Sequence, residues 1–138
     1  MKYQVLMLLS TLLFTSCVEY DRRLKIINNT SHAINVEWEA DFNPTYPSIN
    51  KTGYYLANPL FPNDTLDAVE DARDGWDRFF SNSKTGKLSI FIFNADTLKR
   101  YNSIDMLILN KMYKRLVFTK DQLEQIGWDV EITDEDKL

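Results

Sequence analysis

Residues 88–93 read LSIFIF, an almost uninterrupted apolar run. Successive side chains of a β-strand point to opposite faces, so such a run would place aliphatic residues on one face and phenylalanines on the other. The first set is Leu88, Ile90 and Ile92, and the second is Phe91 and Phe93. A strand that is apolar on both faces is typical of a sheet covered on both sides. The run therefore predicts a central strand with packed layers above and below it.

Alternation of apolar and polar residues predicts further strands on either side of this run. Downstream, Met112–Phe118 is compatible with a strand, and Trp128–Ile132 alternates apolar with acidic residues. Upstream, Arg23–Asn28 and Ile34–Trp38 show the same period of two, which indicates half-buried strands. Because only a short polar turn, Asn28–Ser31, separates the two upstream runs, we expect them to form a β-hairpin.

The segment 41–64 has a different character, because it contains all four prolines of the chain. Proline has no N–H group to donate to a β-ladder, so this segment is expected to be loop or sheet edge. A short strand is plausible within it at Gly53–Ala57, and another is expected just after it at Thr65–Val69.

Short helices are expected between the strands. They cover residues 74–80, 96–101, 104–109 and 119–127. Asp74 and Asp96 are the expected N-caps of the first two. Thr119 and Gln122 have capping-box spacing, and Gly127 would end that helix in a left-handed conformation. The order of elements predicts an α+β fold that is mainly β, an antiparallel sheet or small β-sandwich with short helices at its ends.

The N-terminal residues predict export and lipid attachment. Lys2 precedes the apolar run Val5–Phe14, which is far shorter than the roughly 20 residues that cross a bilayer. Cys17, the only cysteine, follows small residues and resembles the acylated cysteine of bacterial lipoproteins. An ordinary signal peptide with a coincidental cysteine is the alternative. The expected division is a signal peptide over 1–16, acylated Cys17 and a tether over 17–22, one globular domain over 23–133 and an acidic tail over 134–138.

Cysteine usage agrees with this interpretation, since one cysteine cannot form an internal disulfide. Two or more acyl chains give stable membrane attachment. We therefore expect a membrane partner through Cys17 and an outer-membrane lipoprotein, on either the periplasmic face or the cell surface.

Charge and residue types argue against several other functions. Without the signal, fifteen basic and twenty acidic residues leave a formal charge of −5, so no nucleic-acid partner is expected. His32, the only histidine, sits beside a turn and has no nucleophile pattern near it. Zinc sites need three or four His, Cys or carboxylate ligands, and no such set is evident. We expect no metal, no cofactor and no catalytic residue.

One stretch, residues 64–77, is rich in carboxylates. These are Asp64, Asp67, Glu70, Asp71, Asp74 and Asp77. A glycosidase needs two carboxyl groups about 5 to 9.5 Å apart in a cleft, so a carboxylate-based glycan hydrolase is an alternative function. The spacing around Gly75 does not fit a calcium loop. A solvated acidic face is the interpretation we favour.

Aromatic residues in and just after the proline-rich segment are the better candidates for binding. The possible ligand-contacting residues are Tyr46, Tyr54, Tyr55 and Trp76, accompanied by Phe42 and Phe61. Aromatic rings stack on sugars or fill hot spots on protein partners, and proline would keep their loop stiff. The alternative is that these rings only close one end of the sandwich.

Two Asp-Thr-Leu motifs, beginning at Asp64 and Asp96, resemble the short O-glycosylation pattern of exported Bacteroidetes proteins. Thr65 and Thr97 would be the modified residues, which requires an exposed hydroxyl. A capping role for Asp96 explains the second motif without a glycan.

The C-terminal half carries IFIFNADTLKRY followed by YKRLVFTKDQLEQIGWDVEIT. Together with the upstream WDRFF segment, this order resembles a family of small uncharacterised Bacteroidetes lipoproteins, although Tyr101–Ile104 replaces a more polar, tryptophan-containing helix start. The resemblance implies an envelope location and supplies no activity. We therefore expect a non-catalytic envelope binding or interaction domain, with a glycan hydrolase or a purely structural envelope component as alternatives.

Overall fold

The computed structural model describes residues 19–40 and 49–136, which form six strands and six short helical segments. In chain order they are β1 (Tyr20–Asn29), β2 (Ile34–Glu39), α2 (Ile49–Ala57), β3 (Thr65–Asp71), α3 (Gly75–Asn82), β4 (Lys87–Asn94), α4 (Ala95–Tyr101), α5 (Ile104–Leu109), β5 (Lys114–Thr119), α6 (Lys120–Gln125), β6 (Asp129–Thr133) and the 3₁₀ helix η2 (Asp134–Asp136). The predicted α+β class with mainly β character is confirmed.

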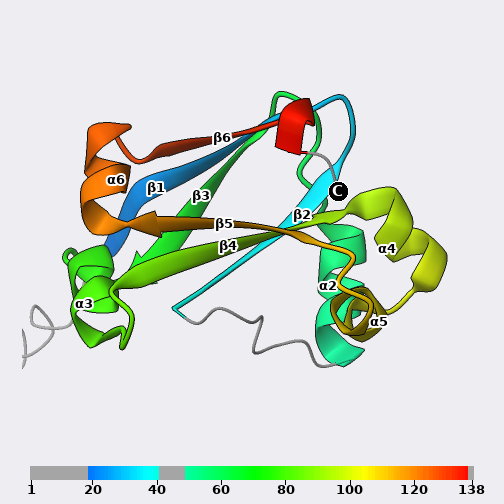
Figure 1. The fold of residues 1–138 in the computed structure, drawn as a ribbon, viewed down its shortest axis with the longest axis horizontal. Helices are drawn as coiled ribbons and strands as arrows, with labels where there is room; N and C mark the ends of the chain where they lie inside the picture. Colours follow the sequence, from blue (N-terminus) through cyan, green and yellow to red (C-terminus); the bar gives the residue numbers. More distant parts are fainter. Residues whose placement is uncertain (1–18, 41–48, 137–138) are drawn as a thin grey trace, which may run out of the picture.

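The strands form two three-stranded sheets with the orders β3-β1-β6 and β2-β4-β5. All pairs are antiparallel except β1 with β6, which is parallel. The sheets pack face to face, and one core is built from the inward side chains of both. Parallel strands need a long crossover, and here everything between β1 and β6, including the whole second sheet, supplies it (Figure 1).

The LSIFIF run is β4, the central strand of its sheet, as predicted. Its aliphatic face, Leu88, Ile90 and Ile92, lies in the core between the two sheets. Its other face turns Phe91 and Phe93 into a second core, formed with buried residues of α2, α4 and α5. The sandwich therefore has a helical layer over part of one outer face.

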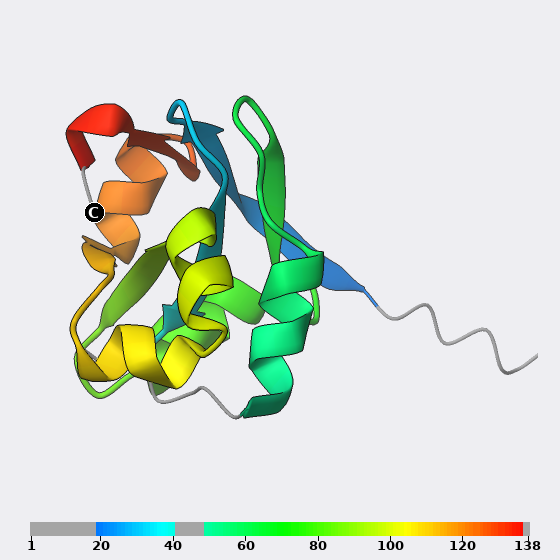
Figure 2. The same cartoon turned by 90° about the vertical axis from the view of Figure 1, so that its right-hand side faces the viewer.

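The helices gather at the two ends of the sandwich. Helices α2, α4 and α5 pack against one another at one end, and α3 and α6 lie at the opposite end (Figures 1 and 2). The predicted placement of helices at the ends is thus confirmed.

The expected hairpin between the first two strand segments is wrong. β1 and β2 lie in different sheets, and the polar residues between them form a corner. Asn28 at this corner is fully buried. Its Nδ2 donates to the carbonyls of His32 and Leu60, both at 2.9 Å, and its Oδ1 accepts from the Thr30 N–H at 3.0 Å. An alternating pattern shows which face of a strand is buried, but it does not show which strand lies beside it.

The strand expected at Gly53–Ala57 is also wrong, because this segment is the second half of α2. Thr52 and Tyr55, three residues apart, are buried, whereas Gly53, Tyr54 and Leu56 are exposed. This spacing is the helical period and puts one face of α2 on the second core. The Thr52 hydroxyl also accepts the Ile104 N–H at the start of α5, at 3.2 Å.

The helix caps of the structure agree only in part with those predicted from the sequence. The capping box of Thr119 and Gln122 is present, and Gly127 is left-handed at φ +68°. Asp74 occupies the N-cap position of α3 without a cap hydrogen bond; its carboxylate instead lies 3.3 Å from Arg78. The N-cap of α4 is Asn94 rather than Asp96, since the Asn94 side chain accepts the Thr97 N–H at 2.9 Å.

The start of α3 is held from a distant strand. The buried Asp21 carboxylate on β1 accepts the Trp76 N–H at 3.1 Å and forms an ion pair with Arg23 at 2.7 Å. Burial raises the pKa of Asp21, but the hydrogen bonds from Arg23 and Trp76 outweigh that effect, and the net pKa is lowered. Arg23 also binds Asp77 of α3 at 2.7 Å, so β1 anchors the helix at two points.

Both ends of the folded region extend beyond the expected boundaries. β1 begins at Tyr20, so part of the expected tether is strand. At the other end, Asp134–Asp136 forms η2, and Asp134 accepts the N–H and the hydroxyl of Ser31 at 3.1 and 3.2 Å. The acidic tail therefore begins as a cap on the corner between β1 and β2.

Candidate functional site

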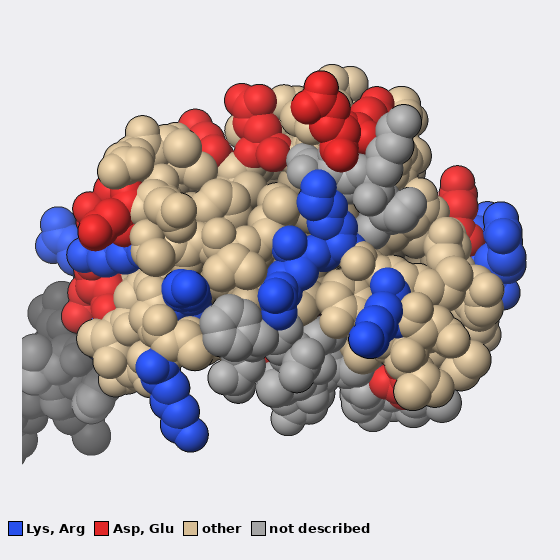
Figure 3. Space-filling model, in the orientation of Figure 1, with Lys and Arg blue, Asp and Glu red and all other residues tan. Residues whose placement is uncertain are grey.

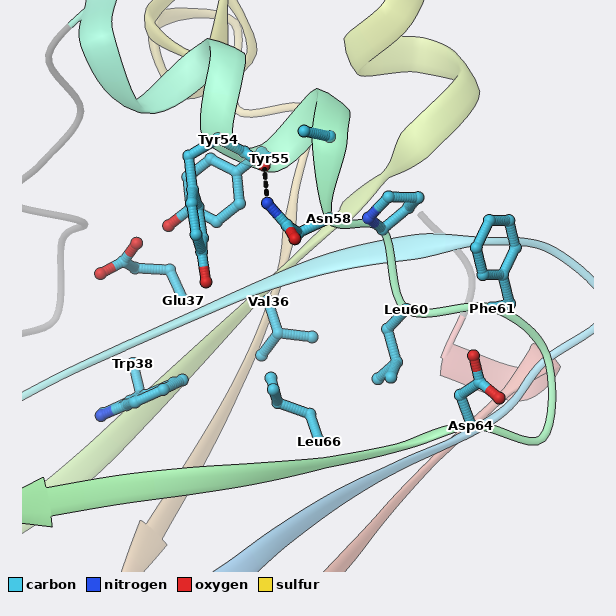
Figure 4. Close-up of a pocket in the computed structure, with 12 residues that line it drawn as sticks. Val36, Glu37, Trp38, Tyr54, Tyr55, Asn58, Leu60, Phe61, Asp64 and Leu66 are labelled. Atoms are coloured by element: carbon cyan, nitrogen blue, oxygen red, sulfur yellow. Dashed lines mark hydrogen bonds between the residues drawn. The ribbon is translucent and has the colours of Figure 1, made fainter.

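The described residues form a groove of about 620 Å³ along the open edge of the sandwich, beneath α2. We call it the α2 groove. It is lined by Val36, Glu37, Trp38, Tyr54, Tyr55, Ala57, Asn58, Pro59, Leu60, Phe61, Asp64 and Leu66. These residues come from β2, α2, the connection after α2, and β3 (Figure 4). Its size falls in the range of about 300 to 1,000 Å³ that is usual for ligand sites.

The wall formed by α2 presents one exposed and one buried tyrosine. Tyr54 is 64% exposed, and its ring packs edge-on against that of Tyr55, with 5.7 Å between the ring centroids. Two asparagines hold the last turn of the helix: Asn58 Nδ2 donates to the Tyr54 carbonyl at 2.8 Å, and Asn35 Nδ2 to the Tyr55 carbonyl at 2.9 Å. The C-terminal carbonyls of a helix lack partners of their own, so these bonds fix the position of the wall.

The floor of the groove lies between β2 and β3. Val36, Trp38 and Leu66 point into the gap between the two strands (Figure 4). The Trp38 Nε1–H donates to Glu70 of β3 at 3.3 Å, which ties the two edge strands together. Burial raises the pKa of Glu70, and the hydrogen bond from Trp38 opposes that rise only in part.

The predicted aromatic residues separate into three groups. Tyr54 and Tyr55 line the α2 groove together with Phe61, which is 56% exposed. Trp76 does not join them: it is fully buried, with its ring 6.5 Å from that of Trp38 and 6.2 Å from that of Trp128. The position of Trp76 as a core residue corrects its assignment as a ligand contact. Tyr46 lies outside the described residues.

Most lining residues were not among the sequence candidates, and these include Glu37, Trp38 and Leu66. Trp38 was expected only on the apolar face of a half-buried strand and Leu66 only within a strand, and both residues do lie in strands. Their access to the groove follows from β2 and β3 both being edge strands on the same side of the sandwich. An edge position depends on sheet order, which the alternating pattern does not encode.

The carboxylates proposed for a hydrolase do not converge on one cavity. Asp77 is paired with Arg23 and Lys120, and Asp74 with Arg78. Of the six, Asp64 alone lines the α2 groove, where the other lining carboxylate is Glu37. Figure 4 shows these two at opposite ends of the groove, an arrangement unlike the facing carboxylates of a glycosidase.

The remaining predicted residues lie apart from the groove's aromatic wall. Thr65 is exposed at the first position of β3, and Thr97 is half-buried in the first turn of α4. His32 Nδ1 lies 3.7 Å from Asp134. Glycosylation of either threonine stays a prediction, and Cys17, the expected lipid attachment point, is outside the described residues.

A second, smaller cavity of about 390 Å³ lies on the other side of the α2 C-terminus, between that helix end and α4. Phe61 and Pro59 line both cavities. Asp96 and Lys99 of α4 are among its lining residues, so this cavity has a basic side chain as well as an acidic one.

The charged side chains of the surface are unevenly arranged. Figure 3 shows acidic side chains along the rim near β6 and η2, and Lys and Arg side chains scattered lower on the same face. No described helix has the length and apolar character that a membrane span requires. Nor does any cluster of three or more His, Cys, Asp or Glu suited to a metal ion occur within 19–40 and 49–136.

Comparison with known proteins gives no relative: no family model, no curated protein and no solved structure matches this chain. The geometry of the α2 groove is therefore the main basis for assigning a function.

Proposed function

We propose that this protein is a non-catalytic binding domain, attached to the cell envelope by lipid on Cys17, and that it holds its ligand in the α2 groove. The envelope location is supported by the signal, the single cysteine and the resemblance described above. The groove supplies the binding surface. Its ligand is a protein segment or a glycan, the two classes that exposed aromatic rings recognise.

The observation that carries this proposal is the pair of exposed rings, Tyr54 and Phe61, at opposite ends of a groove of about 620 Å³. Large aromatic side chains are enriched at binding sites because they bury much area with few rotatable bonds. The hydrogen bonds at the α2 C-terminus and Pro59 hold the groove in shape before binding. A preformed site loses less conformational entropy when a ligand binds.

The binding role is tested by photocrosslinking in the native cell envelope. A benzophenone side chain replaces Phe61, and in a control protein it replaces Ile126, which is also exposed but lies beyond α6. We expect a discrete crosslinked product from position 61 and none from position 126, read by gel shift and mass spectrometry. Equal labelling at both positions, or none at position 61, contradicts a ligand in the groove.

The envelope attachment is tested separately by the intact mass of the native product. Acylation adds the mass of the lipid chains and should be lost in Cys17→Ala. An unmodified mass would refute the anchor without bearing on the groove.

A further inference from the structure

The outer edge of β2 already accepts a strand-like neighbour at one residue. The Ile34 N–H donates to the Leu60 carbonyl at 3.0 Å, and the Leu60 N–H donates to the Ile34 carbonyl at 2.8 Å. Backbone groups alternate in direction along a strand, so those of Val36 and Trp38 point to the same side as those of Ile34, away from β4. Among the described residues, no backbone group pairs with them on that side.

The residues between α2 and Leu60 do not extend this pairing along β2. In a continuing antiparallel strand, Asn58 would lie opposite Val36. Instead, the Asn58 N–H donates to the Tyr55 carbonyl at 3.2 Å, which keeps it in the helix end. Pro59 then redirects the chain with its fixed φ. The edge of β2 is therefore paired at Ile34, by Leu60, and continues at Val36 and Trp38 without a paired strand among the described residues.

The α2 groove runs along this stretch of edge. A strand added to β2 would alternate its side chains between two environments. One set would face the gap to β3, beside Val36, Trp38 and Leu66, and the other would face α2 beside Tyr54. The first environment is apolar, so the added strand needs apolar residues at every second position.

The charge of the groove selects among such strands. Its lining contains the exposed carboxylate of Asp64, the carboxylate of Glu37, which has an interaction partner of its own, and, among the residues that the structure describes, no lysine or arginine. Glu70, bonded to Trp38, adds a third carboxyl group behind the floor. A segment with basic residues between its apolar ones is complementary to this surface, whereas an acidic segment would be repelled.

From this geometry we infer that the α2 groove binds an extended polypeptide of alternating apolar and basic residues, which adds as a strand to the edge of β2. The inference rests on the proposed binding function and names the class of its ligand. Pairing at two positions, Val36 and Trp38, would give a contact of about five residues. Main-chain hydrogen bonds would supply affinity, and the alternate side chains would supply specificity.

The test uses the full chain purified in detergent and the fluorescent peptide acetyl-Val-Lys-Val-Lys-Val-Lys-amide, with binding read by anisotropy. Valines facing the gap to β3 would direct their N–H groups at β2, and lysines would direct theirs away. N-methylation of the valines should therefore weaken binding at least tenfold, and N-methylation of the lysines less than threefold. A peptide with glutamate in place of each lysine (the Val-Glu peptide) should bind at least tenfold more weakly than this Val-Lys peptide.

Protein variants supply a second readout. Tyr54→Ala should weaken binding of the Val-Lys peptide about tenfold, and Asp64→Asn about threefold. Asp67→Asn, which removes an exposed carboxylate of β3 outside the groove, should change nothing. Cellohexaose and chitohexaose serve as glycan probes. If they bind and the peptide does not, the strand-addition inference fails while the binding function stands.

Two other results overturn the inference. Equal effects of valine and lysine N-methylation would mean that the peptide binds without joining the sheet, and failure of the Val-Lys peptide to bind would exclude the ligand class. The crosslinking at position 61 tests the proposed binding function independently of the ligand class.

Discussion

Asn28 shows how much one polar side chain can determine in this fold. It is fully buried, and its amide group bonds to residues on both sides of the corner and to Leu60 of the connection after α2. Its backbone joins the same region, since the Asn28 N–H donates to the Asp64 carbonyl and its own carbonyl accepts from Asn63. One residue thus positions the end of β1, the start of β2 and the far end of the α2 groove.

Asn28→Ala should lower the free energy of unfolding by about 2 to 4 kcal/mol, because it leaves several buried carbonyl and N–H groups without partners. The neighbour Asn29 is exposed, and its side chain donates to the exposed Glu131, so Asn29→Ala should cost under about 0.5 kcal/mol. Urea unfolding followed by circular dichroism measures both. Similar losses in the two variants would show that the corner does not depend on the buried amide.

Glu70 gives the fold a pH dependence of definite sign. Burial raises the pKa of its carboxyl group, so the folded state binds this proton more tightly than the unfolded chain does. Its stabilising contribution is present below the ordinary glutamate pKa and is lost as the pH rises through the raised value.

Glu70→Gln removes the charge but keeps an oxygen that can accept the Trp38 N–H. The variant should melt above the wild type at pH 7, by at most about 4 °C, and the difference should vanish near pH 4. Asp67→Asn, which removes an exposed carboxylate from the same strand, is the control. A lower melting temperature for Glu70→Gln at pH 7 would mean that the ionised carboxylate is the stabilising form.

At the scale of elements, two glycines in helices have opposite roles. A Cβ on Gly75, at the start of α3, would lie 2.6 Å from the Cβ and 3.0 Å from the backbone carbon of Glu70. A Cβ on Gly53, in α2, would meet nothing within 4 Å. Gly75 therefore permits the close approach of α3 to β3, whereas Gly53 only lowers the helix propensity of α2.

Gly75→Ala should destabilise the protein by about 2 to 3 kcal/mol through overpacking, and Gly53→Ala should stabilise it by about 0.5 to 1 kcal/mol. Chemical denaturation of the two proteins under the same conditions measures the difference. If Gly75→Ala were as stable as the wild type, α3 would have to sit less tightly against β3 than these distances indicate.

Local sequence signals predicted which elements form better than they predicted which elements lie side by side. The two-faced β4, the alternating β6 and the capping box of α6 follow from residues close together in the chain. The hairpin failed because β1 takes β3 and β6 as partners, from about 40 and 100 residues away. The predicted N-caps of α3 and α4 were also wrong. For α3 the reason is related, because Asp21 accepts the Trp76 N–H in the first turn from a position 55 residues earlier in the chain.

The candidate site was predictable only in its aromatic composition. Tyr54 and Tyr55 were identified from the proline-rich segment, although as part of a strand rather than a helix. Trp76 has the same aromatic character and a nearby position, yet it fills the core against Trp38 and Trp128. Composition does not distinguish a ring that closes the core from one that lines a groove, since that depends on which strands form the sheet edges.

At the scale of the molecule, the sandwich is asymmetric about its two edges. On one side, α6 connects β5 to β6, and on the other side, α2 connects β2 to β3. The two sides differ because α2 stands off from β2 and β3 and leaves the α2 groove beneath it, where the Trp38 to Glu70 hydrogen bond joins the two strands. The position of α2 therefore places the groove, and with it the proposed ligand, at the β2 edge.

The early start of β1 has a consequence for how the molecule would stand on a membrane. Only two residues separate Cys17 from Tyr20, and three extended residues span at most about 11 Å. An acylated Cys17 would therefore hold the end of the sandwich that carries α3 directly over the lipid headgroups. Ile27 pairs with Thr65 at the other end of β1, roughly 23 Å away along the strand. The Phe61 end of the groove, beside the Asn28 end of β1, would then lie at the end of the domain away from the lipid attachment point.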